Sequence, residues 1–483
     1  MQVILNSPGF SYDVHSLVKA FYPEEDIVIT DEGVSALFMI RIDPADPVGD
    51  DITGSVSISA PQNRDVATHF EEFSHISRPA VKSLVKRMLY TMLCDITHKA
   101  LPWGTMTGIR PVKVPMKLIR EGFDDTAVKD HMKSVYLVSD RKADLATKIA
   151  HTEKKILDLV SPGGYSLYIG IPFCPTTCMY CSFTSYPIAS WKERVDDYLT
   201  AVKRELDFFA EYYDRGPDSV YIGGGTPTTL SPGQLSELLC YITDNFDMSL
   251  CRERTVEAGR PDSITKEKLC VIKEYGFDRI SVNPQTMNDK TLRLIGRRHT
   301  TDDVYAAFET ARSVGFSNIN TDIIIGLPGE GEEEVNNTLS AIKKLSPDSL
   351  TIHSMAIKRA AAMSDFLAEH GQLRVKDAEK LMDMATEAAR GLGLMPYYLY
   401  RQKNMSGNLE NIGFARDGCF GIYNVVIMEE VTDIAAVGAG TISKRVFAHD
   451  RIERCDNVKD AAMYMDRIDE MIDRKKKLFN KGE

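Results

Sequence analysis

No stretch of this 483-residue chain reaches the roughly 18–20 consecutive apolar residues that a membrane-spanning helix requires. Its first segment, Met1–Pro8, also lacks the positively charged start of a secretory signal peptide. A disulfide framework is missing too, because six of the nine cysteines are scattered without regular spacing, which is typical of reduced thiols. These six are Cys94, Cys240, Cys251, Cys270, Cys419 and Cys455. The absences together predict a cytoplasmic protein with no membrane partner.

The chain also has fewer positively charged residues, 58 Lys and Arg, than negatively charged ones, 69 Asp and Glu. The formal net charge of -11 argues against the extended basic footprint of a nucleic-acid-binding protein, although it leaves room for a local basic pocket. The contents of 43% hydrophobic and 26% charged residues are those of a globular protein. The chain is too long for a single compact core, so we expect two or three domains. We also expect a monomer without a nucleic-acid partner.

The three remaining cysteines stand close together. Cys174, Cys178 and Cys181 have C-x3-C-x2-C spacing and follow an apolar run, Ser166–Ile171, that is typical of a buried strand. Three thiolates on one loop can bind three irons of a [4Fe–4S] cluster, which leaves the fourth iron free for a small molecule. A zinc site would require a fourth cysteine or histidine nearby, but no second cysteine pair occurs and His151 lies far upstream. The spacing therefore favours an iron–sulfur cluster with one open iron.

Strand and helix patterns alternate along the middle of the chain, which predicts an α/β fold with a parallel sheet and helices outside it. The expected strands are Ser166–Ile171, Ser219–Ile222, Thr255–Ala258, Arg279–Val282, Ile319–Ile325 and Ser349–His353. The expected helices are Lys192–Tyr213, Pro232–Asn245, Lys266–Tyr275, Thr301–Val314, Glu332–Lys344 and Val375–Leu392. Six units are too few for a closed eight-stranded barrel, so we expect an open, partial (β/α)6 barrel. Its chemistry should lie at the carboxyl ends of the strands, where the cysteines follow the first strand.

Three domains are expected. Residues 1–160 form an N-terminal α+β domain of unknown role, residues 161–395 the partial barrel, and residues 396–483 a mainly helical C-terminal region that covers the substrate. The N-terminal strands, expected to be antiparallel, are Ile27–Thr30, Ala36–Ile42 and Gly54–Ile58, followed by a helix over Arg78–His98. The C-terminal region is expected to end in a helix over Asn457–Leu478.

Two further expected strand ends carry glycine motifs that suit a small ligand, and one between them carries Glu257. Gly223, Gly224 and Gly225 follow the second strand, and their backbone can approach a ligand closely, although a lone glycine triplet is more often a simple turn. Glu257 ends the third strand and could bind a ribose hydroxyl or an amino group; by itself it would be read as a structural carboxylate. A Gly/Pro turn in Ile324–Glu330 can pack an adenine ring.

With these three motifs at three strand ends, the sequence resembles the radical S-adenosylmethionine (SAM) superfamily. The resemblance implies that Cys174, Cys178 and Cys181 bind the cluster and that SAM chelates the open iron through its amino and carboxylate groups. A one-electron donor of the flavodoxin or ferredoxin type would then release a 5′-deoxyadenosyl radical. The cofactors implied are thus a [4Fe–4S] cluster and SAM.

A finer resemblance, over about 166–450, is to the oxygen-independent coproporphyrinogen III oxidases, also called coproporphyrinogen dehydrogenases, and within them to the HemZ-type branch. The residues that carry it are Tyr168–Cys174, Gly223–Thr228, Arg279–Gln285, Arg297–His299 and Asn320–Asp322, with Thr107–Pro111 and Tyr397–Gly407 indicating the branch. One departure is Gly170, where the best-known branch has a histidine. That branch's N-terminal substrate-binding segment is also not recognisable in residues 1–155.

In the better-known members of the family two SAM molecules bind, and the resemblance assigns residues to each. The first would contact Tyr168, Gly224, Glu257 and Ile442. The second would contact Tyr180, Gly225, Thr226, Gln285, Arg297, Asp322 and Ala356. Gln285 and Arg297 can converge on a carboxylate. The alternatives stay open: Gln285 and Asp322 could make ordinary hydrogen bonds inside the barrel, and Arg297 could be solvated beside Arg298.

The reaction implied is the conversion of two propionates of coproporphyrinogen III into vinyl groups, which gives protoporphyrinogen IX in anaerobic haem biosynthesis. A hydrogen atom would leave the propionate β-carbon, followed by CO2 and one electron. Basic candidates for binding this tetrapyrrole substrate are Arg110, Lys113, Arg298, Lys358, Arg359 and Arg401. The rival functions are a haem chaperone of the same superfamily, whose His-Asn-x-x-Tyr motif is not visible near 404–424, and a radical methyltransferase that opens the haem ring.

Overall fold

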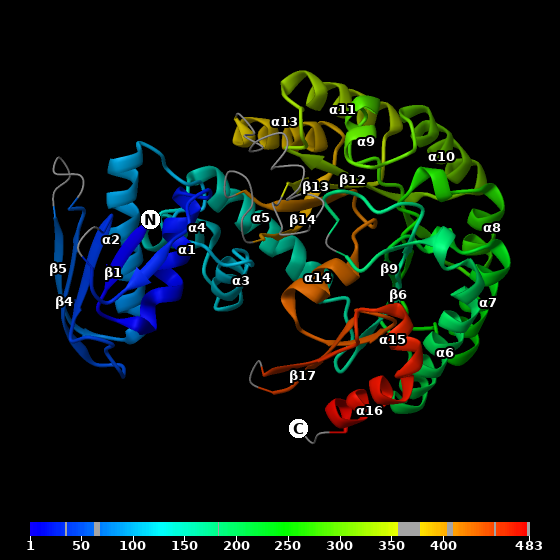
Figure 1. The fold of residues 1–483 in the computed structure, drawn as a ribbon, viewed down its shortest axis with the longest axis horizontal. Coiled ribbons are helices and arrows are strands. Elements are labelled where there is room, and N and C mark those ends of the chain that lie inside the picture. Colours follow the sequence, from blue (N-terminus) through cyan, green and yellow to red (C-terminus); the bar gives the residue numbers. More distant parts are fainter. Residues whose placement is uncertain are drawn as a thin grey trace. The chain divides into compact units, whose positions relative to one another are not determined.

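The computed structural model describes residues 1–33, 36–61, 68–181, 183–355, 377–402, 409–448 and 451–480. Contacts divide the chain into two units (Figure 1). The first comprises Met1–His151 with Leu399–Glu410, and the second comprises Thr152–Tyr398 with Asn411–Glu483. No described helix is both long and apolar enough to cross a membrane.

The first unit is a five-stranded sheet in the order β2-β1-β3-β4-β5 with helices packed beside it. Its strands are β1 Gln2–Leu5, β2 Val28–Thr30, β3 Phe38–Asp43, β4 Ile52–Ser59 and β5 His69–Ile76. Its helices are α1 Ser11–Phe21, α2 Arg78–Thr97, α3 Lys113–Arg120, α4 Asp125–Tyr136 and the first part of α5 Asp140–Leu157. The pairs β3–β4 and β4–β5 are antiparallel as expected, but β2 pairs parallel with β1. The expectation was wrong there because alternation along a strand shows its buried face and not the direction of its neighbour.

Residues from the C-terminal third of the sequence complete the interior of this first unit. Glu410 is buried, accepts a hydrogen bond from the Trp103 indole nitrogen at 2.7 Å and forms an ion pair with Lys142. Arg401 is also buried and donates to the carbonyl oxygens of Met106 and Leu409. These contacts give the substrate candidate Arg401 partners within its own unit.

The second unit contains the expected barrel (Figure 1). Its 11-stranded sheet has the order β14-β15-β13-β12-β11-β10-β9-β6-β16-β17-β18. The six strands from β6 to β13 in this order pair parallel with their neighbours, as predicted. They are β6 Tyr165–Ile171, β9 Ser219–Gly224, β10 Glu253–Val256, β11 Arg279–Ser281, β12 Asn318–Ile325 and β13 Ser349–Ser354. The expected α/β class and partial barrel are confirmed.

Helices cover the outer face of these strands because each presents one apolar stripe to the sheet. They are α6 Val195–Tyr212, α7 Pro232–Asn245, α8 Lys266–Glu274, α9 Asp289–Leu294, α10 Thr301–Val314, α11 Glu332–Leu345 and α13 Ala378–Gly391. The local sequence determines where several of these helices begin or end. A capping box of Ser231 and Gln234 begins α7, and one of Thr300 and Asp303 begins α10. Gly315, with φ of 97°, ends α10 in the left-handed conformation.

The C-terminal part of the chain was expected to be mainly helical, and this was wrong. It supplies five strands to the same sheet: β14 Met395–Tyr400, β15 Asn411–Ala415, β16 Asp433–Val437, β17 Ile442–Val446 and β18 Ile452–Asp456. It also supplies the helices α14 Ile422–Glu429, α15 Ala461–Asp466 and α16 Ile468–Phe479. Strand β16 pairs parallel with β6, whereas β15 pairs antiparallel with β13. The segments of β15 to β18 are too short to show a recognisable periodicity, and pairing within the sheet stabilises them as strands.

Candidate active site

The cysteine loop lies at the carboxyl end of β6, where the partial barrel is expected to carry its chemistry. It starts at β7, Phe173–Cys174, which pairs with β8, Tyr186–Pro187. Backbone contacts fix its position: the Met179 amide donates to the Ile295 carbonyl at 3.1 Å, and the Thr176 hydroxyl donates to the Gly296 carbonyl at 3.0 Å. The loop is thus tied to the turn that precedes Arg297.

The three loop cysteines have free thiols and lie within electrostatic reach of one another. Burial, with smaller contributions from Cys181 and Cys178, raises the pKa of Cys174 to about 11, although the hydrogen bond with Thr226 opposes the shift. The Cys174 sulfur lies 3.4 Å from the Thr226 hydroxyl. Within the described residues, no three Cys, His, Asp or Glu side chains are gathered as a metal site. Three free thiols on one loop are nevertheless the donors that an iron–sulfur cluster uses, so the donor set fits this group.

The glycine triplet packs directly against the start of the cysteine loop. The Gly225 and Thr226 amides donate to the Ile171 and Phe173 carbonyls, both at 2.7 Å. A Cβ at Gly225 would lie 2.6 Å from the Phe173 oxygen, so no side chain fits there. Gly224 has φ of 98°, which glycine adopts without strain. These constraints explain the glycines and place Thr226 beside Cys174.

Glu257 follows β10 and lies next to a stack of three tyrosines inside the barrel. The Tyr221 hydroxyl donates to its carboxylate, and the Tyr221 ring stacks on Tyr423 and Tyr168 with centroids 4.6 and 6.1 Å apart. Burial, with a smaller contribution from Asp322, raises the pKa of Glu257 to about 7, although the hydrogen bond from Tyr221 opposes the shift. The carboxyl group can therefore change its charge near neutral pH.

Three of the residues expected around the second SAM, Gln285, Arg297 and Asp322, form one hydrogen-bonded group with Asn283. Buried Arg297 donates to the Asn283 carbonyl, and the Asn283 side-chain oxygen accepts from the Asp322 amide at 3.2 Å. The Gln285 amide donates to the Asp322 carbonyl at 3.0 Å, and Gln285 has φ of 69°. The Nε of Arg297 is buried without a hydrogen-bond partner, which suits an additional acceptor. Arg297 is therefore not a solvated surface residue.

The surroundings of Asp322 favour the ionised form of its carboxyl group. Burial would raise the pKa of its carboxyl group, but His353 and the Asn320 amide lower it below its usual value. The Asn320 nitrogen donates to Asp322 at 2.8 Å, and the His353 Nε2 lies 3.6 Å from the other carboxylate oxygen. An ionised carboxylate in this place can bind hydroxyl or ammonium groups.

The turn that follows β12 has an apolar surface. Ile324, Leu327 and Met355 form a buried cluster with Leu292 and Ile295. Met179 and Tyr180 of the cysteine loop pack against this cluster. Apolar side chains beside the cysteine loop suit the adenine ring that the sequence predicted there.

Some of the predicted site residues are exposed, lie outside the described residues or belong to the first unit. Ile442 begins β17 and is 45% exposed, and Ala356 lies outside the described residues. Of the basic substrate candidates, Lys358 and Arg359 also lie outside them, Arg298 is exposed, and Arg110 and Lys113 belong to the first unit. The substrate contacts remain predictions.

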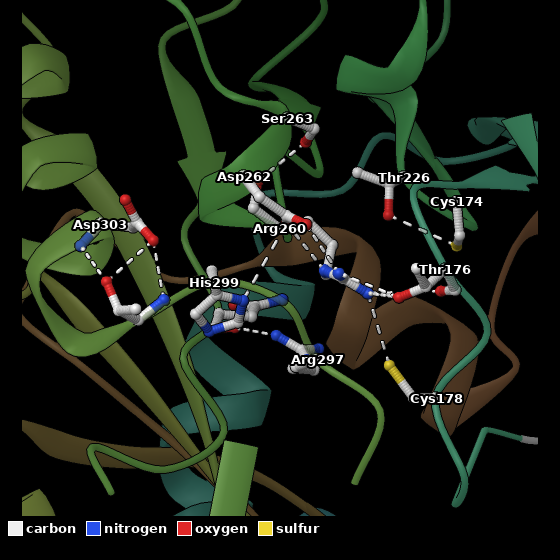
Figure 2. A network of polar contacts seen from close by, with 12 residues as sticks. Cys174, Thr176, Cys178, Thr226, Arg260, Asp262, Ser263, Arg297, His299 and Asp303 are labelled. Atoms are coloured by element: carbon white, nitrogen blue, oxygen red, sulfur yellow. Dashed lines mark hydrogen bonds and ion pairs between the residues drawn. The ribbon is translucent and has the colours of Figure 1, made fainter. Parts of the chain in front are cut away.

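Sequence reasoning missed Arg260, His299, Tyr221 and Tyr423. Arg260 and His299 lie beneath the cysteine loop with Arg297 (Figure 2). Both ring nitrogens of buried His299 lack hydrogen-bond partners, and burial together with the Arg297 charge lowers its pKa to about 4. Arg260 follows Glu257 by three positions, so an arginine just beyond a strand end was the available signal.

Known proteins resemble this chain over the region that contains the site. The model of the radical SAM superfamily matches residues 168–342. The oxygen-independent coproporphyrinogen-III oxidase-like protein HemZ of Bacillus subtilis is 38% identical over 402 residues, which are 82% of this chain and 80% of HemZ. The chain belongs to the radical SAM superfamily and to its HemZ-like group.

Other radical SAM relatives match shorter parts. The heme chaperone HemW of Bacillus subtilis is 36% identical over 224 residues, 45% of this chain and 57% of HemW. The oxygen-independent coproporphyrinogen III oxidase of Escherichia coli is 32% identical over 192 residues, 40% of this chain and 42% of that protein. The solved structure of coproporphyrinogen III oxidase (HemN) from Escherichia coli superposes with a TM-score of 0.51 and 24% identity over 67% of this chain and 73% of that chain. That superposition supports the fold.

Proposed function

We propose that this radical SAM protein oxidatively decarboxylates two propionates of coproporphyrinogen III to vinyl groups and forms protoporphyrinogen IX. The observation that carries the proposal is the likeness to HemZ over most of both chains, together with the Gln285–Arg297–Asp322 group beside the cysteine loop. The loop carries Cys174, Cys178 and Cys181 as the proposed cluster ligands. Reduced thiols support a cytoplasmic location, and a flavodoxin- or ferredoxin-type protein is the proposed electron donor.

The chain's own residues would bind and orient the cofactors. When bound, the cluster and SAM supply one electron and a carbon radical that removes a hydrogen atom. Glu257, held by Tyr221, faces the first proposed SAM position with Tyr168, Gly224 and Ile442. The second position would be lined by Tyr180, Gly225, Thr226, Gln285, Arg297, Asp322 and Ala356. Arg297 presents a fixed positive charge for a carboxylate, and Asp322 presents a negative one for hydroxyl or ammonium groups.

The substrate needs no acid or base from the protein in this reaction. Each propionate loses a β-hydrogen atom, then CO2 and one electron, which leaves the vinyl group. The chain's task is to hold the propionate and to keep water and other hydrogen donors away. Buried tyrosines and the apolar cluster around Leu327 support such a shielded interior.

Anaerobic turnover tests the proposal. Cluster-loaded protein, coproporphyrinogen III, SAM and a reductant are expected to yield protoporphyrinogen IX, CO2, methionine and 5′-deoxyadenosine, measured by liquid chromatography and mass spectrometry. Substrate labelled with deuterium at the propionate β-carbon should transfer deuterium to 5′-deoxyadenosine. Unlabelled 5′-deoxyadenosine without a vinyl product would contradict the assignment.

The likeness to HemW supports a second candidate, a haem-binding chaperone. Stoichiometric haem binding without any product from coproporphyrinogen III would favour it. A methylated linear tetrapyrrole formed from haem would favour the ring-opening methyltransferase. The same incubations therefore separate all three functions.

SAM binding is expected to depend on pH through Glu257. As pH rises through about 7 this carboxyl group gains its charge, because burial raises its pKa to about that value. Between pH 6 and 8 its ionised fraction rises from roughly 10% to roughly 90%, so the affinity for SAM should rise up to roughly tenfold. Equilibrium dialysis of cluster-loaded protein without reductant measures this change.

Glu257→Gln is the matched control for that measurement. Its amide keeps the size of the side chain but cannot ionise, so any remaining pH dependence comes from SAM itself or from other groups. Identical pH profiles for the parent and the variant would disprove the role of Glu257.

A further inference from the structure

Arg260 connects the cysteine loop to the barrel beneath it (Figure 2). It follows β10 and is only 3% exposed. One side of its guanidinium group donates to both carboxylate oxygens of Asp262, at 3.0 and 2.8 Å. The other side reaches the loop: Nη1 lies 3.3 Å from the Thr176 carbonyl oxygen and 3.2 Å from its hydroxyl. The planar guanidinium group is thus hydrogen-bonded to the Asp262 carboxylate along one edge and to Thr176 of the loop along the other.

The same Nη1 also donates to a cysteine sulfur. It lies 3.6 Å from Sγ of Cys178, within hydrogen-bond range for sulfur. Two other contacts that fix the loop, from the Met179 amide and the Thr176 hydroxyl to the carbonyls of Ile295 and Gly296, are neutral, whereas Arg297 is a second cation whose charge acts on Cys178. Arg260 therefore brings a full positive charge and a directed N–H group to one proposed cluster ligand.

We propose that Arg260 is a positioning residue that orders the cysteine loop before the cluster binds and stabilises the reduced cluster through Cys178. A reduced cluster carries one more negative charge, so a nearby cation and an N–H···S hydrogen bond favour it over the oxidised form. Partners outside the ligand set commonly orient the ligands and tune the bound group in this way. The inference rests on the proposed role of Cys178 as a ligand.

Amide hydrogen exchange of the cluster-free protein tests whether Arg260 orders the cysteine loop. Arg260→Met is expected to speed exchange of the amides between Cys174 and Cys181 by about tenfold, because the loop loses charged hydrogen bonds. The control is Arg312→Met, which removes an arginine that pairs with Asp348 at 2.7 Å elsewhere in the same unit. The control should leave the exchange of the loop unchanged.

A reductive titration of the cluster-loaded protein, monitored by electron paramagnetic resonance, tests whether Arg260 stabilises the reduced cluster. At a fixed solution potential the ratio of reduced to oxidised cluster should fall roughly tenfold in Arg260→Met, equal to about 59 mV for one electron. Arg260→Lys keeps the charge but lacks the planar fork, so it should recover part of the loss and supplies the measurement if Arg260→Met does not load a cluster.

If Arg260→Met leaves either the exchange rate of the loop amides or the ratio of reduced to oxidised cluster unchanged, the proposal is wrong. It is also wrong if Arg312→Met changes the loop exchange as much as Arg260→Met does. Neither measurement uses a tetrapyrrole, so a parent protein that fails to decarboxylate coproporphyrinogen III would refute the proposed function and leave this result standing. A normal turnover with unchanged loop exchange would refute only the role of Arg260.

Discussion

Replacing Cys178 with alanine is expected to abolish the [4Fe–4S] cluster. The spacing leaves only three thiolates for four irons, so losing one leaves too few ligands for assembly. After anaerobic reconstitution, iron and sulfide bound to Cys178→Ala should fall below about one tenth of the parent's content. The visible charge-transfer absorption and the cleavage of SAM should disappear with them.

Cys270→Ala is the matched control, because Cys270 is an exposed free thiol of the same unit outside the loop. It should bind a full cluster. Circular dichroism should show that both variants remain folded, since Cys178 is not part of the hydrophobic core. A full cluster in Cys178→Ala would contradict the ligand assignment and would direct attention to another donor.

Removing Glu205 is expected to destabilise the second unit by about 3–5 kcal/mol, because it leaves Lys475 charged and buried without its partner. Both side chains are fully buried. Glu205 also accepts hydrogen bonds from the Tyr464 hydroxyl at 2.7 Å, the Asn457 side chain at 2.8 Å and the Gly438 amide at 2.8 Å. It therefore joins α6 to α15, α16 and the loop between β16 and β17.

The free energy of unfolding of Glu205→Ala can be measured by urea titration. The chain has two tryptophans, so a Trp103→Phe background leaves Trp191 of the second unit as the fluorescent probe. The control is Asp469→Ala, which breaks the exposed ion pair with Arg204 between the same two helices, α6 and α16. It should cost less than about 1 kcal/mol.

A double variant, Glu205→Met with Lys475→Met, separates the two causes of the loss. It removes both charges together, so it should be more stable than Glu205→Ala if the unpaired ammonium group is responsible. An equal or smaller cost for Glu205→Ala than for Asp469→Ala would show that the buried pair does not stabilise this unit.

Much of the barrel follows from local sequence. The strand Ser166–Ile171 and the helices Pro232–Asn245 and Thr301–Val314 lie where apolar periodicity predicted them, and local capping boxes begin both helices. The glycines before Thr226 could also be read from the sequence, because only glycine permits such a close backbone approach. These features depend on neighbours along the chain.

The missed features depend on contacts between distant segments. Tyr423 stacks on Tyr221 although the two residues lie about 200 positions apart in the sequence, and no pattern near either residue predicts the contact. Strands β15 and β16 exist as strands because the edges at β13 and β6 offer unpaired backbone groups. Residues 399–410 belong to the first unit although the sequence placed them in a C-terminal region.

The proposed kind of chemistry can be predicted from the sequence alone. The spacing of Cys174, Cys178 and Cys181 after a buried strand is a local property, and three thiolates would leave one iron of a [4Fe–4S] cluster open. What surrounds that loop depends on the tertiary structure. Arg260 follows β10 and Arg297 lies in the connection between β11 and β12, and both reach Cys178 because parallel strands bring their carboxyl ends to one edge of the sheet.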